Sequence, residues 1–147
     1  MGFGNPYGDP WSVQLILDYT KGLHEELGIT HIALSDTIGA ATPEVLKEVF
    51  EAVSINLPSI EIGVHLHTVP NNATKLIESA MSAGCQHFDS AMMGIGGCPM
   101  ATDVLTGNLA TETLIDFCVK HQINTGIDMN AISQAQEKAA SIFNFYH

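Results

Sequence analysis

Two kinds of apolar pattern alternate along this chain, and the alternation constrains its fold more than any other feature. Short continuous apolar runs are typical of buried strands, whereas longer stretches repeat apolar residues every three or four positions, as amphipathic helices do. A strand and its helix together take about 25–30 residues, the length of a βα unit. Strands joined by helical crossovers run parallel in one sheet. The sequence therefore predicts an α/β fold.

The predicted strands account for about half of a barrel of eight βα units. Three full strands are expected, with the remnant of a fourth at the start of the chain, over residues 29–34, 60–64, 85–91 and 2–4. A complete (β/α)8 barrel takes about 250 residues, whereas this chain has 147. No linker or low-complexity stretch divides the sequence, so residues 1–147 are expected to form a single, incomplete domain.

Capping residues mark where the predicted helices begin and end. Asp9-Pro10 is expected to start the first helix and Gly28 to end it, because an acceptor side chain followed by proline favours a helix start and glycine favours an end. Thr42-Pro43 is expected to start the second helix, and Gly84 to end the third. The last two helices are expected to begin near Thr111 and near Asn130.

The composition excludes several classes of partner. The net charge is −11, and all five basic residues are lysines, so arginine is absent. Such a chain has no basic face for phosphate groups, which argues against nucleic acid. No apolar run approaches the roughly 20 residues that span a bilayer, and the first residues lack the pattern of a signal peptide. We therefore expect no association with membranes. The three cysteines are an odd set without ligand-like spacing, which favours a reducing, cytoplasmic location.

A pair of histidines, His65 and His67, lies at the end of the second full strand. Side chains two positions apart on a strand point the same way, so both imidazoles can reach one metal ion. The alternative is two histidines at a polar strand end, and spacing alone does not decide between them. Cys98 lies on a glycine-rich loop after the next strand. The other five histidines have no partner by spacing and are expected to have no chemical role: His24, His31, His87, His121 and His147.

Four short motifs carry a resemblance to a known family. They are Leu34-Ser35-Asp36-Thr37-Ile38-Gly39, His65-Leu66-His67, Gly96-Gly97-Cys98-Pro99 and Gly107-Asn108-Leu109-Ala110-Thr111-Glu112. In this order and spacing the chain resembles 3-hydroxy-3-methylglutaryl-CoA lyase, of the metal-dependent lyase and synthase group built on TIM barrels. The resemblance covers essentially the whole chain and implies the C-terminal half of a (β/α)8 TIM barrel, its last four βα units. Two departures stand out: Thr68, where the family often has aspartate, and the absence of the family's Arg-Asp pair.

The resemblance implies a divalent metal site. His65 and His67 would be ligands, and Asn108 would supply an amide oxygen as a third. An asparagine after glycine is otherwise a common turn residue, so the role of Asn108 depends on the resemblance. Imidazoles and oxygens with open positions suit Mg²⁺ or Mn²⁺, although the nitrogens also attract Zn²⁺ and Co²⁺.

The resemblance also implies the groups that move protons and bind substrate. Cys98 would be a catalytic thiol acting with His65, and the glycines before it would allow its loop to close over the site. Taken alone, Cys98 is better interpreted as a free surface cysteine beside a turn. Asp36 and Thr37 at a strand end, and Asn5 in the first loop, would contact the substrate. Asp36 has a strong alternative as a turn or cap residue.

The implied reaction is the cleavage of 3-hydroxy-3-methylglutaryl-CoA to acetyl-CoA and acetoacetate. The family's Arg-Asp pair stabilises the enolate and binds metal, so a chain without arginine is expected to need a missing N-terminal half-barrel and to be inactive alone. An acidic chain is also a poor sole host for the anionic acyl-CoA substrate. Two alternatives stay open: a related metal-dependent aldolase or acyl-CoA synthase, and a non-catalytic half-barrel that self-associates. Exposed sheet edges would favour a homo-oligomer.

Overall fold

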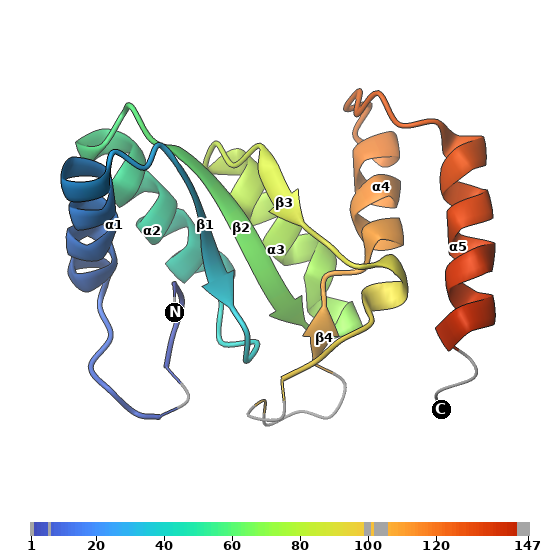
Figure 1. Ribbon diagram of the computed structural model, residues 1–147, viewed down its shortest axis with the longest axis horizontal. Coiled ribbons are helices and arrows are strands. Elements are labelled where there is room, and N and C mark those ends of the chain that lie inside the picture. Colours follow the sequence, from blue (N-terminus) through green and yellow to red (C-terminus); the bar gives the residue numbers. More distant parts are fainter. Residues whose placement is uncertain (1, 6, 99–100, 102–105, 144–147) are drawn as a thin grey trace.

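Three parallel strands form the centre of the computed structural model, which describes residues 2–5, 7–98, 101 and 106–143 (Figure 1). Strand β2 (Glu61–Thr68) lies in the middle, with β1 (His31–Asp36) and β3 (His87–Asp89) on either side. The parallel strands and helical crossovers confirm the predicted α/β arrangement. A further two-residue strand, β4 (Gly107–Asn108), pairs antiparallel with the end of β2.

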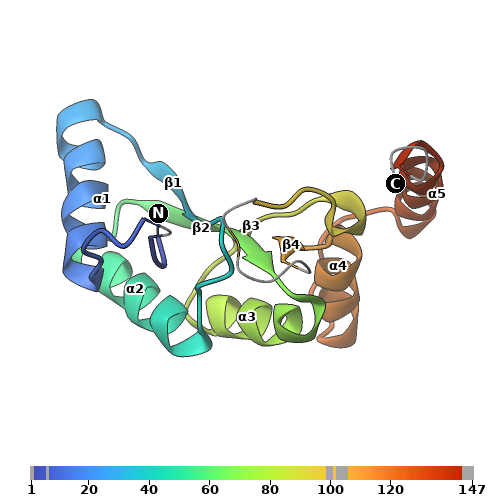
Figure 2. The same ribbon diagram turned by 90° about the horizontal axis from the view of Figure 1, so that it is seen from below.

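Helices pack on one face of this sheet and leave the other face open (Figure 2). They are α1 (Val13–Leu27), α2 (Pro43–Asn56), α3 (Pro70–Ser82) and α4 (Thr111–Lys120). A single 3-10 turn, η1 (Met92–Gly94), follows β3, and α5 (Met129–Phe143) ends the described chain. A sheet that is covered by helices on one side only is the arrangement of a barrel wall.

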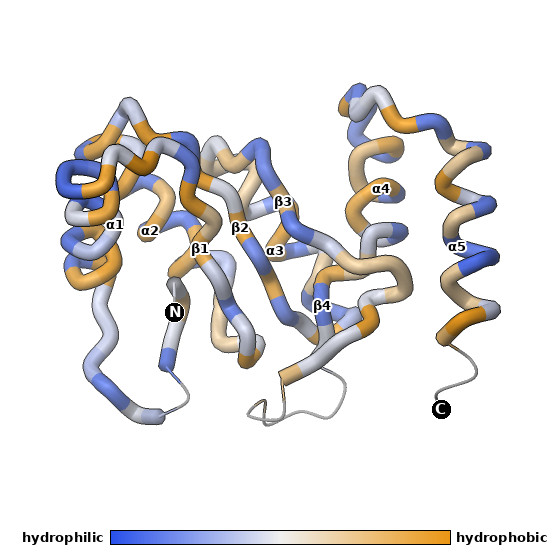
Figure 3. The backbone as a smooth tube through the Cα atoms, viewed as in Figure 1, coloured by the Kyte–Doolittle hydropathy of each residue, from blue (hydrophilic) through white to orange (hydrophobic). Residues whose placement is uncertain are grey.

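The alternation of side chains along β2 separates the core from the open face. Ile62, Val64 and Leu66 are buried, in a cluster with the apolar residues of α2 and α3: Leu46, Val49, Phe50, Val53, Ala73, Leu76, Ile77 and Ala80. Because successive strand residues point to opposite faces, Glu61, Gly63, His65 and His67 project to the other side. Figure 3 shows the resulting mixture of hydrophobic and hydrophilic positions along the strands.

The capping predictions are confirmed for α2 and for the end of α1. Thr42 accepts a hydrogen bond from the backbone N–H of Val45, with proline at the next position, and Gly28 has the left-handed φ of 67° that ends α1. The predicted start of α1 is wrong, because its N-cap is Ser12 and not Asp9. The carboxylate of Asp9 instead accepts a hydrogen bond from the side chain of Asn5, which keeps this segment in a loop.

The strand boundaries also differ from the predicted ones. The remnant strand at residues 2–4 is not a strand, although the backbone N–H of Gly2 donates to the carbonyl of Ser35, 2.7 Å away, at the edge of β1. Strand β3 is shorter than residues 85–91. The backbone N–H of Cys85, the predicted first residue, donates a hydrogen bond to the carbonyl of Ala80 near the end of α3. Ala91, the predicted last residue, forms an isolated bridge with Ala110 outside the three-stranded sheet. Local backbone contacts thus shorten the strand at both ends.

The last helix packs least against the rest of the protein. Only Ala139 of α5 is buried, and the main neighbour of this helix is the η1 turn. Figure 1 shows α5 standing beside α4, away from the sheet. Among the described residues, no helix combines the length and the hydropathy needed to cross a membrane.

Candidate functional site

The predicted histidine pair lies on the open face, near the carboxyl end of β2. The ring centroids of His65 and His67 are 5.3 Å apart, and the rings are tilted by 45°. The two side chains therefore share one face of the strand, as their spacing predicts.

His67 is almost completely buried, and its environment favours the neutral imidazole. Its pKa is lowered from the ordinary value, first by burial and then by the nearby His65, while Asp36 and a side-chain hydrogen bond with Asn108 act in the opposite direction. Its Nδ1 atom is buried and has no hydrogen-bond partner among the described residues. A buried neutral imidazole with an unmatched nitrogen fits a metal ligand, because a ligand must be deprotonated and a buried polar atom needs a partner.

His65 is oriented by a carboxylate from the neighbouring strand. Asp89 is its register partner on β3, and the Oδ2 atom of Asp89 lies 3.4 Å from Nδ1 of His65. A carboxylate at one ring nitrogen orients the imidazole and directs the other nitrogen outward, which is how metal-binding and proton-transferring histidines are held. Asp89 was not among the predicted site residues, because its partner lies on another strand.

Asn108 meets the histidines through the short strand β4. It is the direct register partner of His67. Its Nδ2 atom donates to the carbonyls of Ile95, at 2.7 Å, and Gly96, at 3.2 Å, in the glycine-rich loop. The structure thus brings together the three residues that the resemblance implies as ligands, and it places the loop against one of them.

The glycines of this loop allow close contact between backbones. A Cβ atom on Gly96 would lie 2.6 Å from Nδ2 of Asn108, and one on Gly94 would lie 2.9 Å from the carbonyl of Asn108. Gly94 and Gly96 also have positive φ angles, 65° and 97°. The base of the loop is held by Glu112, whose carboxylate oxygens lie 3.0 and 2.9 Å from the backbone N–H of Met93. Glu112 belongs to the fourth sequence motif, but no role was predicted for it.

Cys98 lies on this loop, directly after its glycines, and is half-buried. Its carbonyl accepts a hydrogen bond from the backbone N–H of Ala101. Among the described residues, its thiol makes no hydrogen bond to His65 or His67, so its catalytic role stays a prediction. Pro99, the next residue of the motif, lies outside the described residues.

The three predicted substrate-binding residues have different surroundings. Asp36 is fully buried, and its carboxylate accepts hydrogen bonds from the backbone N–H groups of Ile38, Ala40 and Ala41. These contacts favour the alternative structural role of Asp36 and argue against direct contact with a substrate. The side chain of Asn5 holds its own loop by accepting from Tyr7 and donating to Asp9.

Thr37 is half-buried at the start of the turn that Asp36 organises. Its predicted contact with substrate stays a prediction, as does that of Asn5.

The donor set of this site fits part of a cation's coordination sphere. Two imidazoles and one amide oxygen suit a divalent metal that takes further oxygen ligands from elsewhere. In the part of the chain that the structure describes, no group of three or more histidine, cysteine, aspartate or glutamate side chains is arranged to hold a metal ion. The residues present are therefore compatible with a cation but do not enclose one.

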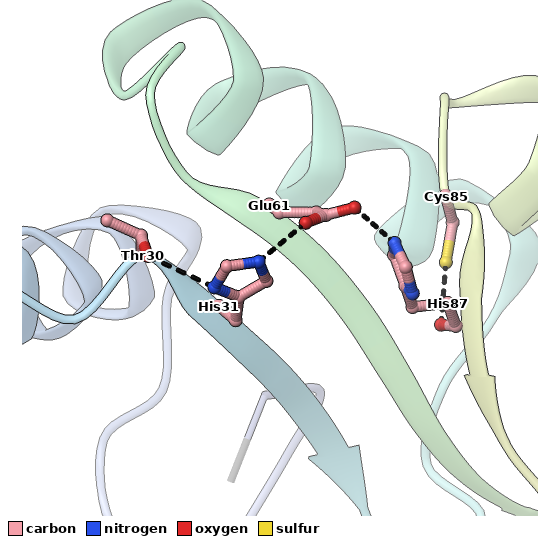
Figure 4. A network of polar contacts seen from close by, with 5 residues as sticks. All are labelled: Thr30, His31, Glu61, Cys85 and His87. Carbon is pink, nitrogen blue, oxygen red and sulfur yellow. Dashed lines mark hydrogen bonds and ion pairs between the residues drawn. The ribbon is translucent and has the colours of Figure 1, made fainter.

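Two of the histidines that have no partner by spacing have one across strands at the amino end of the sheet, and the expectation that they have no chemical role stays a prediction. Figure 4 shows His31 and His87 on either side of Glu61. Nε2 of His31 lies 2.8 Å from one carboxylate oxygen of Glu61, and Nε2 of His87 contacts the other. These three residues lie on adjacent strands, which is why spacing along the chain did not reveal them.

Two more histidines also have partners. His121 stacks on Phe117 with ring centroids 4.1 Å apart, and Nε2 of His24 lies 3.1 Å from the hydroxyl of Ser59. These contacts, like those at Glu61, are explained by packing within the fold.

Comparison with known proteins identifies the relatives of this chain. The family model described as HMGL-like matches residues 11–138. The chain is 35% identical over 132 residues to a cytoplasmic 3-hydroxy-3-methylglutaryl-CoA lyase of Rattus norvegicus, covering 90% of this chain and 38% of the relative. It is 32% identical to a hydroxymethylglutaryl-CoA lyase of Pseudomonas mevalonii, covering 89% and 43%. The chain thus spans less than half the length of these relatives.

Solved structures give the same result. An HMG-CoA lyase from Acinetobacter baumannii, in complex with coenzyme A and 3-methylmalate, superimposes with a TM-score of 0.83 and 29% identity, over 97% of this chain and 46% of that one. A hydroxymethylglutaryl-CoA lyase from Pseudomonas aeruginosa gives a TM-score of 0.84 and 29% identity, over 96% and 46%. These proteins are TIM barrels, so the fold of this chain is a partial barrel, as predicted.

Proposed function

Because the chain belongs to the HMGL-like family, we propose that it forms the C-terminal half of the catalytic barrel of a lyase that cleaves 3-hydroxy-3-methylglutaryl-CoA to acetyl-CoA and acetoacetate. The observation that carries this proposal is the convergence of His65, His67 and Asn108 beside the glycine-rich loop, at the carboxyl end of the parallel strands. This end of a barrel is where catalytic sites are built.

We propose that His65, His67 and Asn108 hold a divalent cation, Mg²⁺ or Mn²⁺. The support is the chemistry of the donor set and the buried, unmatched Nδ1 atom of His67. Such a cation would polarise the hydroxyl and carboxylate oxygens of the substrate and orient them for cleavage. The lowered pKa of His67 supports this assignment, because it keeps the imidazole neutral near neutral pH.

The proposed proton transfers involve His65 and Cys98. His65 takes part in removing the proton of the substrate hydroxyl, and the electrons of the O–H bond form the ketone C=O of acetoacetate as the carbon–carbon bond breaks. The electrons of that carbon–carbon bond form the enolate of the thioester, and Cys98 then protonates the α-carbon of this enolate to give acetyl-CoA. Asp89 supports the role of His65, because its carboxylate lies 3.4 Å from Nδ1 and orients the ring.

A second half-barrel is part of this proposal. The enolate needs a cationic partner, and coenzyme A carries several negative charges, whereas this chain has a net charge of −11 and no arginine. We propose that an N-terminal half-barrel supplies these groups and covers the open face. A homo-oligomer and a cytoplasmic location belong to the same proposal.

A reconstitution assay tests the proposed function. The chain is purified alone and with a co-expressed N-terminal half of a bacterial lyase, and acetoacetate formation is followed with Mg²⁺ present. The chain alone should show no turnover, and the combination should restore it. His65→Ala should abolish the restored activity, whereas His87→Ala, at the other end of the sheet, should keep most of it. Robust turnover by the chain alone would refute the need for a partner, and no turnover by the combination would refute the assignment as a lyase.

A further inference from the structure

The side chain of Asn108 has two ends that face two different parts of the protein. Its amide nitrogen lies within hydrogen-bond distance of two carbonyl oxygens, those of Ile95 and Gly96. Carbonyl oxygens only accept, so the amide must present its NH₂ group to the loop. The Oδ1 atom then faces away from the loop, and Asn108 is the register partner of His67.

The backbone of the loop is held against Asn108 as well. The backbone N–H of Asn108 donates to the carbonyl of Gly96 at 2.8 Å. A Cβ atom on Gly97 would lie 3.0 Å from the carbonyl of Thr106, and one on Gly107 would lie 2.8 Å from the carbonyl of Gly94. The loop and residues 106–108 are thus in backbone contact along their length, with glycine on both sides. The loop cannot move away without breaking the contacts to Asn108.

We propose, on the basis of the proposed function, that Asn108 is a positioning residue. It connects the Cys98 loop, the glycine-rich segment of residues 94–98, to the cation site. Its nitrogen holds the backbone two residues before Cys98, while its oxygen faces the cation. A cation at the oxygen would draw electron density from the amide and strengthen the hydrogen bonds that its nitrogen donates. Cation binding would therefore fix the loop more firmly and make the Cys98 thiol less accessible.

Two variants break the same contact from opposite sides. Asn108→Asp keeps an oxygen toward His67 but replaces the donor by an acceptor that faces two carbonyls. Gly96→Ala leaves Asn108 intact and places a methyl group against its Nδ2 atom. The matched control is Asn130→Asp, which makes the same chemical change at an exposed position in α5.

The readout is the rate at which iodoacetamide alkylates Cys98, followed by peptide mass spectrometry without added metal. Cys85 and Cys118 are buried, so their protection shows in the same sample that the variant is folded. We expect Asn108→Asp and Gly96→Ala to speed alkylation of Cys98 at least about fivefold, the effect of losing one ordinary hydrogen bond. Asn130→Asp should match the wild type. Equal Cys98 rates in the wild type and both folded variants would overturn the proposal.

A second arm adds Mg²⁺ and separates this inference from the proposed function. In the wild type, Mg²⁺ should slow alkylation of Cys98 at least about twofold. In Asn108→Asp, calorimetry should still detect Mg²⁺ binding, but the rate should no longer respond to it. A response equal to that of the wild type would refute the coupling. If the wild type binds no Mg²⁺ while both variants still speed alkylation, the positioning role stands and the cation site of the proposed function falls.

Discussion

The two ends of the sheet both carry histidines beside a carboxylate, but in different physical states. At the amino end, His31 and His87 each contact Glu61, and all three side chains are about half or more exposed (Figure 4). At the carboxyl end, His67 is 7% exposed, its Nδ1 atom is unmatched, and its pKa is lowered. The histidines of the amino end are thus paired and exposed to solvent, whereas the carboxyl end contains a buried imidazole nitrogen without a partner among the described residues.

The comparison shows that a histidine beside a carboxylate is weak evidence for a functional site. Exposed ion pairs typically contribute less than about 1 kcal/mol and occur by chance on surfaces. A buried polar atom without a partner costs free energy, so it persists where a ligand repays that cost. Burial and the unmatched nitrogen, rather than residue type, therefore distinguish His67 from the other histidines.

The largest expected contrast between the two ends is in stability. Asp36→Ala should lower the free energy of unfolding by at least about 3 kcal/mol, because three backbone N–H groups lose a buried charged acceptor. Glu61→Ala should cost less than about 1 kcal/mol, since its pairs are exposed. Urea denaturation monitored by circular dichroism measures both. If Asp36→Ala fails to fold, Asp36→Asn, which keeps an acceptor, should be intermediate, and similar costs at the two ends would contradict the comparison.

Metal affinity gives the next contrast. His67→Ala should weaken Mn²⁺ binding by at least about tenfold. The loss of an outer-shell partner usually weakens metal binding by about 10–100-fold, and the loss of a direct ligand should cost at least the lower figure. His87→Ala removes an imidazole from the amino end and should leave affinity within about twofold of the wild type. Isothermal titration calorimetry on both folded variants decides, and equal affinities would remove the ligand assignment.

The pH dependence of stability gives the smallest contrast. The pKa of His67 is lower in the folded protein than in the unfolded chain, where it is near 6.5. Below about pH 6.5 the unfolded chain therefore binds the proton more readily, and stability falls as the pH drops, by at most about 1.4 kcal/mol per pH unit. The wild type should lose more stability than His67→Gln between about pH 7.5 and pH 5.5 in urea titrations. Identical slopes for His67→Gln and the wild type would be evidence against the buried state of His67.

Local rules were sufficient for those parts of the fold that depend on neighbouring residues. The Thr42 cap, the end of α1 at Gly28 and the shared face of His65 and His67 follow from contacts within a few positions. The start of α1 was missed because Asn5 engages Asp9 in a loop, a competing contact that capping rules do not include. Strand β4 was missed because a two-residue strand has no periodicity to detect.

The sequence by itself determined the alternating strands and helices, the histidine pair and the order of the motifs, because these depend on side-chain periodicity and residue type. Tertiary structure alone decided that Asp89 faces His65, that Asn108 lies opposite His67 and that Glu112 holds the base of the loop. These pairs join residues from different strands and loops. Their meeting depends on sheet register and on the close approach of two glycine-containing backbones, which pattern along the chain does not encode.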